Sequence, residues 1–283
     1  RSFVINELVK KVLGTVPVNH DGSVAFEAPA NTPIQMQLLD ENGMAVMTMR
    51  SLVYLQPGER ASCVGCHEPR TNAPPPMRPA LATIHKISPP VGPRYDYGMS
   101  FVRTVQPVLD RYCISCHGLE KTEKNLELTG VRMDKGGEKW MLNSAAKSYW
   151  HLLDVPNMVK VAPRNGETYP SHTNDYFASA GKLAKMLLDG HPDKDGKKLV
   201  HVDRESFQRI VDWLDLNAQY YGDYSFNRIE DRTSQPEGEK VLREAVRKRF
   251  GDQMAGQPYA TLVNVANPDE SRILMAALPV AAG

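Results

Sequence analysis

Alternating apolar and polar residues predict short β-strands in the first part of the chain. The clearest case is Ile34-Gln35-Met36-Gln37-Leu38, an alternation typical of a strand with one buried face. Asp21-Gly22 and Asn42-Gly43 separate neighbouring runs, and such pairs favour the tight turns of β-hairpins. Together these signals predict a small antiparallel β-sandwich that ends at Gln56-Pro57-Gly58. Its expected strands are residues 12–18, 23–27, 34–39 and 46–54.

A helical period replaces this alternation in the second part of the chain. Apolar residues recur at helical spacing from Phe101 to Tyr112, and Pro107 is expected to kink this helix or to start a new one. Core packing is the simplest interpretation of such apolar stripes, although two helices closing over a bound group would show the same pattern. The predicted fold class is therefore α+β, a small β-sandwich followed by a mainly α-helical domain. Further helices are expected over 178–189, over 203–218 with Asp203 as N-cap, and over 238–250.

Composition and charge narrow the choice of partners. Hydrophobic residues make up 41% and charged residues 24% of the 283, as in ordinary globular proteins. The net charge of +1 argues against nucleic acid or a membrane surface as the main partner. The most apolar run, residues 273–282, contains Pro279, so no transmembrane helix is predicted. No signal peptide opens the chain, and both ends suggest a processed or fragmentary piece.

All four cysteines fall in two copies of one short motif. The pattern Cys-x-x-Cys-His is the attachment signal of c-type haem, because two thiols add across the haem vinyl groups and the adjacent histidine is placed to bind the iron. We therefore expect two covalently attached haems c. The first is held by Cys63, Cys66 and His67, and the second by Cys113, Cys116 and His117.

Two other interpretations of the cysteines are open. Paired Cys-x-x-Cys motifs also occur in tetrathiolate zinc sites, but the 46 residues between Cys66 and Cys113 exceed the usual zinc-ribbon spacing. Two disulfides are the third option, although cysteines two residues apart more often mark a redox or ligand site. Both alternatives remain less well supported than haem.

The motifs also divide the chain and suggest its compartment. Haem c is attached outside the bacterial cytoplasm, so we expect a periplasmic or extracellular protein, and the lack of a spare cysteine suits an oxidising compartment. Pro-rich sequence around Pro74-Pro75-Pro76 indicates a linker. The expected parts are a β-sandwich-like segment at 1–57, the first haem loop and linker at 58–98, a helical cytochrome c-type domain at 99–222, and an extension at 223–283.

Several segments together resemble the C-terminal part of hydrazine synthase alpha subunits, and similar pieces occur in planctomycete-type cytochromes c. The resemblance spans most of residues 12–283, and the haem motifs are its most specific part. Its other segments are Gly14-Thr15-Val16-Pro17-Val18, Asp21-Gly22-Ser23, Gln56-Pro57-Gly58-Glu59-Arg60, Gly190-His191, Trp213-Leu214-Asp215-Leu216-Asn217 and Pro268-Asp269-Glu270-Ser271-Arg272.

The resemblance implies an upstream β-propeller and two haems c in separate domains. In that family the first motif histidine turns to a zinc ion, and a tyrosine four residues further on binds the iron. The corresponding residue here is Thr71, so His67 is expected to bind the first iron in the ordinary way. The family's second haem is bis-histidine and passes electrons, which implies His117 and a distal histidine here.

His191 is the strongest candidate for that distal ligand, since it follows Gly190 at the end of an amphipathic helix and matches the family's Gly-His pair. The expected iron ligands are therefore His67, His117 and His191. Weaker candidates for the second haem are His201, His172 and His151, and those for the first are His20, His85 and Met77.

These residues support three functions. A dihaem segment would transfer electrons to other redox proteins or haem subunits. Alternatively, a five-coordinate first haem would make the chain a catalytic subunit of a multihaem oxidoreductase acting on small nitrogen compounds, with Glu68 and Arg70 nearby. As a third possibility, the chain is a structural piece of a larger multihaem complex. Electron transfer is the preferred hypothesis, and whether the chain is an enzyme stays open.

Overall fold

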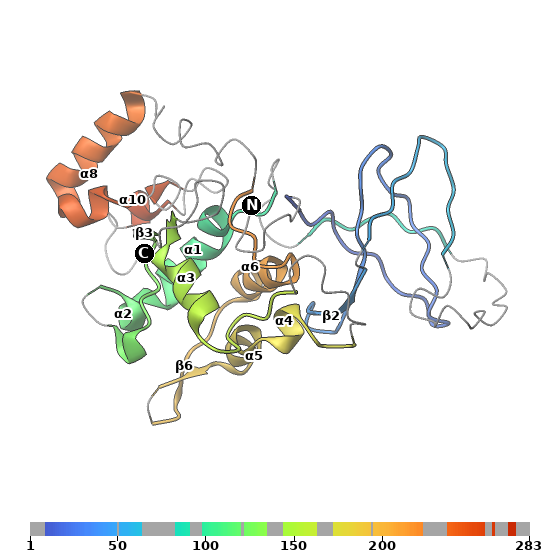
Figure 1. The fold of residues 1–283 in the computed structure, drawn as a ribbon, viewed down its shortest axis with the longest axis horizontal. Coiled ribbons are helices and arrows are strands. Elements are labelled where there is room, and N and C mark those ends of the chain that lie inside the picture. Colours follow the sequence, from blue (N-terminus) through green and yellow to red (C-terminus); the bar gives the residue numbers. More distant parts are fainter. Residues whose placement is uncertain are drawn as a thin grey trace. The chain divides into compact units, whose positions relative to one another are not determined.

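The computed structural model combines helices with small antiparallel sheets, so the chain is α+β as the sequence predicts (Figure 1). It divides into two compact units, one of residues 1–12, 39–46 and 91–283 and the other of residues 13–38 and 47–90. Within the described part of the chain, no helix is both long and apolar enough to cross a membrane. The structure describes residues 9–49, 51–63, 83–90, 98–119, 122–134, 144–162, 172–193, 195–222, 237–257, 262–263 and 271–275.

The larger unit carries most of the regular structure. Its helices and strands, together with the hairpin shared by both units, follow each other along the chain in this order: β1 Gln37–Leu39, β2 Ala45–Thr48, the π-helical turn η1 Phe101–Val105, α1 Gln106–Tyr112, α2 Ile114–His117, the 3-10 turn η2 Glu123–Asn125, β3 Arg132–Asp134, β4 Ser144–Ala146, α3 Lys147–Asp154, α4 Phe177–Ala180, α5 Lys182–Asp189, β5 His191–Pro192, β6 Lys198–Val200, α6 Arg204–Asp215, α8 Glu237–Ala255 and α10 Arg272–Met275.

The strands expected in the first part are shorter than their sequence pattern predicts. Among the described residues of this part, only β1 and β2 pair as a sheet, and the turn between them is the one predicted at Asn42-Gly43, where Gly43 has φ 82°. The expected strands at 12–18 and 23–27 are reduced to single bridges, Thr15 with Ser88 and Phe26 with His85. These partners lie some sixty to seventy residues away in the sequence, so local alternation could not specify the pairing.

Helix α1 begins where the sequence predicts a break. The π-helical turn η1 ends at Val105, and Pro107 then occupies the first turn of α1, where a missing backbone N–H costs no hydrogen bond. Phe101, Val105 and Leu109 are almost fully buried, which explains the apolar stripe that spans both pieces. The C-terminal end of α1 is thereby fixed against the core, directly before Cys113.

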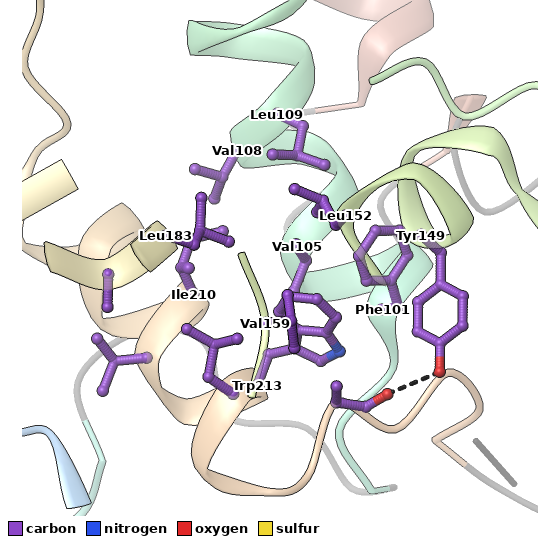
Figure 2. Packing of buried hydrophobic residues seen from close by; sticks show 14 of the residues in the cluster. Phe101, Val105, Val108, Leu109, Tyr149, Leu152, Val159, Leu183, Ile210 and Trp213 are labelled. Atoms are coloured by element: carbon purple, nitrogen blue, oxygen red, sulfur yellow. Dashed lines mark hydrogen bonds between the residues drawn. The ribbon is translucent and has the colours of Figure 1, made fainter. Parts of the chain in front are cut away.

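The core of the larger unit is aromatic at its centre (Figure 2). Phe101 lies 5.1 Å, between ring centroids, from both Tyr149 and Trp213. Tyr149 donates a hydrogen bond to the carbonyl oxygen of Ala218 at 2.9 Å, so its hydroxyl is satisfied within the core. Helices η1, α1, α3 and α6 are therefore held together around one packed cluster.

The helices after residue 177 follow the predicted pattern with one break. The expected helix over 178–189 is split into α4 and α5 at Gly181, whose backbone is extended (φ −74°, ψ 156°). The first N–H groups of α5 bond instead to the carbonyl oxygens of Asn157 and Met158. Helix α6 begins as predicted, with the Asp203 carboxylate accepting from the backbone N–H of Ser206 at 2.9 Å. Helix α8 covers the predicted 238–250 and continues past a kink at Gly251.

A buried carboxyl at the end of α6 joins three elements. Asp215 is 5% exposed and accepts hydrogen bonds from the backbone N–H of Ala45 at 2.9 Å and of Ala178 at 3.0 Å. Burial raises the pKa of Asp215 to about 7, although these two hydrogen bonds oppose the shift. Burial likewise raises the pKa of Asp212, one turn earlier, to about 6. Strand β2 and helix α4 are thus tied to α6 by one titratable side chain.

These shifts predict a pH-dependent stability. Each carboxyl keeps its proton in the folded state over a pH range in which the unfolded chain has released it. The free energy of unfolding should therefore fall as pH rises from about 4 to about 7, by roughly 1.4 kcal/mol for each unit of pKa shift. Urea unfolding at intervals between pH 4.5 and 7.5 measures this slope.

Asp215→Asn should flatten the slope, because the amide does not titrate. The exposed Asp203→Asn serves as the control, since the pKa of Asp203 lies at about 2 and outside the window. Partial burial raises the pKa of Asp203, but the hydrogen bonds that its carboxylate accepts from Ser206 and Tyr112 lower the pKa by more. A slope that is unchanged in Asp215→Asn would contradict this assignment.

Candidate functional site

The second Cys-x-x-Cys-His motif forms a single helical turn at the end of α1. The backbone N–H of Cys113 still bonds to Leu109 at 2.8 Å, and α2 follows with the N–H of His117 bonded to the carbonyl oxygen of Cys113 at 2.9 Å. Gly118 ends this turn with an extended backbone (φ −97°, ψ −162°), and a Cβ there would lie only 2.4 Å from the carbonyl oxygen of Ile114. The two thiols and the imidazole therefore come from one rigid turn.

His117 is buried and oriented by the chain that passes over it. Its Nδ1 lies 3.1 Å from the carbonyl oxygen of Leu126, and its own carbonyl oxygen accepts from the N–H of Leu128 at 2.7 Å. A carbonyl oxygen only accepts, so Nδ1 is the donor and Nε2 presents its lone pair. Burial lowers the pKa of His117, which favours the neutral imidazole that metals bind.

His191 is presented by the turn that ends α5. Gly190 has φ 87°, a left-handed conformation that favours glycine, and a Cβ there would lie 2.8 Å from Cε1 of His201. The Nδ1 of His191 lies 2.7 Å from the carbonyl oxygen of Pro192. As in His117, Nδ1 is therefore the donor and Nε2 is left with its lone pair.

The structure brings His117 and His191 together. Their ring centroids are 6.1 Å apart and their planes are inclined by 51°. Both rings have Nδ1 occupied by a backbone carbonyl, so the nitrogen left for a metal is Nε2 in each case. The arrangement suits two axial ligands of one metal.

Exposed leucines surround this histidine pair along the chain. Leu119 follows His117 by two residues, Leu188 precedes Gly190 by two residues, and Leu199 lies in β6, the strand paired with β5. Their exposed fractions are 38%, 46% and 55%. Exposed apolar side chains this close in sequence to both histidines are candidates for the apolar wall of a ligand site.

A hydrogen bond links the motif to the segment that follows the β5–β6 hairpin. Tyr112, the residue before Cys113, donates from its hydroxyl to the carboxylate of Asp203 at 2.7 Å. Arg111 lies 3.8 Å from the same carboxylate. Asp203 therefore caps α6 and also holds the end of α1 in place.

The first thiol of the motif is a poor nucleophile in the metal-free chain. Burial raises the pKa of the Cys113 thiol to about 12, with the nearby Asp110 and Cys116 as further causes. No group of three or more histidine, cysteine or acidic side chains arranged for a metal occurs among the described residues. Cys113 and Cys116 are thiols in the structure rather than a disulfide.

The remaining predicted ligands are placed as follows. Cys63 is exposed in the smaller unit, and Cys66, His67, Thr71 and Met77 lie outside the described residues. His85 is half-buried in that unit and its Nε2 is buried without a hydrogen-bond partner, whereas His20 is exposed. His201 and His172 are exposed, and His151 uses its Nδ1 to accept from the N–H of Glu127. Of the candidates weighed for the second haem, His191 alone forms a ring contact with His117 among the described residues.

Sequence reasoning missed the groups that orient the two imidazoles. Leu126 and Pro192 act through backbone carbonyl oxygens, which leave no side-chain signal in a sequence. Gly190 was noticed only as part of a Gly-His pair, although a glycine directly after a helix is itself a signal of a left-handed turn.

Comparisons with known proteins give the following matches. Residues 4–68 match the model of the hydrazine synthase alpha subunit middle domain. The curated hydrazine synthase subunit alpha of Kuenenia stuttgartiensis is 38% identical over 56 residues, which is 20% of this chain and 7% of that subunit. The solved hydrazine synthase of the same organism covers 69% of this chain and 31% of its own, at 19% identity and a TM-score of 0.46. The chain is thus similar to the hydrazine synthase alpha subunit, and the matched part is a small share of that subunit.

Proposed function

We propose that this hydrazine synthase alpha-like chain is a dihaem c-type cytochrome segment that transfers electrons. In this proposal Cys113 and Cys116 attach the second haem, and His117 and His191 are its axial ligands. A cytochrome c-type helical domain over 99–222 holds it, after the β-sandwich-like segment. Cys63, Cys66 and His67 attach the first haem by the same chemistry, on the strength of the motif alone.

The separation of the two imidazoles is the observation that carries the proposal. An imidazole nitrogen binds a metal at about 2 Å, so two rings on opposite sides of one metal have their nitrogens about 4 Å apart and their centroids about 6 Å apart. The rings of His117 and His191 are 6.1 Å apart.

The surrounding residues determine which chemistry the site supports. A bound haem c supplies one-electron transfer, with a potential set by its axial ligands and its surroundings. With His117 and His191 both holding the haem iron, no position would be left for a substrate at this site. The carbonyl oxygens of Leu126 and Pro192 accept from Nδ1, which fixes each ring and raises its basicity as a ligand.

The proposal extends to compartment and partners. Haem attachment through thioethers takes place outside the bacterial cytoplasm, which favours a periplasmic or extracellular chain. The matched subunit name supports a place in a multisubunit complex, and its other haem subunits or redox proteins are the expected electron partners.

Counting covalent haem tests the proposal. A pyridine haemochrome spectrum of acid-acetone-washed chain, expressed with a haem c attachment system, should show about two haems per chain. The double variant Cys113→Ala/Cys116→Ala should lose the second haem, and the matched Cys63→Ala/Cys66→Ala should lose only the first. Absence of covalent haem, with zinc bound instead, would overturn the proposal.

A further inference from the structure

A buried acid lies one helical turn before the haem motif. Asp110 belongs to α1 and precedes Cys113 by three residues, so both side chains lie on the same face of the helix. Its side chain is 10% exposed, and its Oδ1 accepts from Nε2 of Gln106 at 2.9 Å. Arg272 of α10 lies 3.6 Å away and is the paired cation.

Hydrogen bonds connect this acid to the proposed axial ligand. Nε2 of Gln106 also donates to the carbonyl oxygen of Leu128 at 3.0 Å. The N–H of Leu128 donates in turn to the carbonyl oxygen of His117 at 2.7 Å, and the preceding turn of chain supplies the carbonyl of Leu126 to the imidazole. The carboxylate of Asp110 is therefore joined to the backbone of His117 through Gln106 and Leu128.

The surroundings of Asp110 bring its pKa close to neutral pH. Burial raises the pKa of Asp110 to about 6, and the charge of Arg272 and the hydrogen bond from Gln106 act against that rise. The negative charge of Asp110 also acts on the Cys113 side chain, since it contributes to the raised pKa of that thiol. Among the described residues, Arg272 from α10 and Cys113 from its own helix are the charged and titratable groups that face it.

We propose that Asp110 binds a proton when the haem held by Cys113, Cys116 and His117 is reduced, and releases it on oxidation. The electron comes from, and returns to, a redox partner, and the proton is exchanged with water. Reduction is thus accompanied by the uptake of up to one proton, and oxidation by its release. This inference rests on the function proposed above.

The physical reason is the loss of one positive charge beside the acid. A unit charge about 10 Å away, at an effective dielectric constant of about 20, changes proton affinity by about tenfold. Reduction removes one positive charge from the centre that Cys113 anchors, so the deprotonated carboxylate becomes less stable and Asp110 takes up a proton. The midpoint potential should then fall with rising pH near pH 6 and level off on either side.

Redox titrations of the haem-loaded full chain test this directly. Followed at the low-spin six-coordinate haem between pH 4.5 and 8.5, the midpoint potential should depend on pH in the native chain and be flat in Asp110→Asn. Redox-difference infrared spectra should show a carboxylic acid carbonyl band that appears on reduction and is missing in the variant.

Asp212→Asn is the matched control. Asp212 is also buried with its pKa raised to about 6, but it lies in α6 and bonds to Gln208. Its variant should keep the pH dependence. A dependence that survives in Asp110→Asn would overturn the inference and place the proton on another group, such as a haem propionate. A potential independent of pH in the native chain would overturn it as well, while the haem count would leave the proposed function standing.

A second variant covers the case in which Asp110→Asn does not fold. Arg272→Met removes the cation that opposes protonation, so the pH-dependent range should move to higher pH. An unmoved range would contradict the role of Asp110. A chain without covalent haem would overturn both proposals together.

Discussion

His191→Ala is expected to convert the second haem of the loaded chain from a six-coordinate low-spin state to a five-coordinate high-spin state. The rings of His117 and His191 lie 6.1 Å apart, the spacing that two ligands of one metal require. With one ring removed, the sixth position opens to small ligands. The reduced variant should therefore bind about one more carbon monoxide per chain than the native protein. Absorption spectra and carbon monoxide titration measure both changes.

His201→Ala is the matched control for this experiment. His201 is exposed, and its ring lies against Gly190, directly beside the proposed ligand. A general disturbance of this turn would affect both variants, whereas loss of an axial ligand affects only one. A low-spin haem that persists in His191→Ala would contradict the assignment and return the search to His172 and His151.

The pairing of the two histidines could be predicted in part. Cys-x-x-Cys-His signals attachment chemistry, and a Gly-His pair at the end of an amphipathic helix marked His191. The groups that aim the rings could not be found in the same way. Leu126 and Pro192 contribute carbonyl oxygens, whose direction depends on the path of the folded backbone.

The fold was predictable where its cause is local. Pro107 and Asp203 mark helix starts through a missing N–H and a capping carboxylate, and both predictions are confirmed. The split at Gly181 was missed because the first N–H groups of α5 bond to Asn157 and Met158, which no local pattern indicates. Strand lengths in the first part were overestimated, since their partners come from residues 83–90. Helix α3 was not predicted, and it is held by tertiary contacts of Tyr149.

The contacts of Asp110 could likewise be predicted from the sequence only in part. Its spacing from Cys113 is visible in the sequence, but Arg272 comes from a segment more than a hundred and fifty residues later. Nothing local indicates that this arginine lies beside α1. The network that connects Asp110 to His117 therefore required the structure.

Trp213→Ala should cost roughly 3–5 kcal/mol of the free energy of unfolding. Trp213 is fully buried in α6, lies 5.1 Å from Phe101 and 6.3 Å from Tyr149 between ring centroids, and donates from Nε1 to the carbonyl oxygen of Gln219 at 3.1 Å. Truncation leaves a cavity at the centre of the aromatic cluster and removes a buried hydrogen bond. Urea unfolding followed by circular dichroism measures the loss.

Two further variants separate the causes of that loss. Trp213→Phe keeps much of the packing but not the Nε1–H donor, so its cost should be roughly 1–3 kcal/mol. Val241→Ala changes a side chain that is 65% exposed and should stay within about 0.5 kcal/mol of the native protein. Gln219 also bonds through its side chain to the carbonyl oxygens of Lys10 and Met99. A loss in the free energy of unfolding as small for Trp213→Ala as for Val241→Ala would contradict the central role of the aromatic cluster in holding η1, α3 and α6 together. The end of α1, which carries the haem motif, would then lack this support from the core.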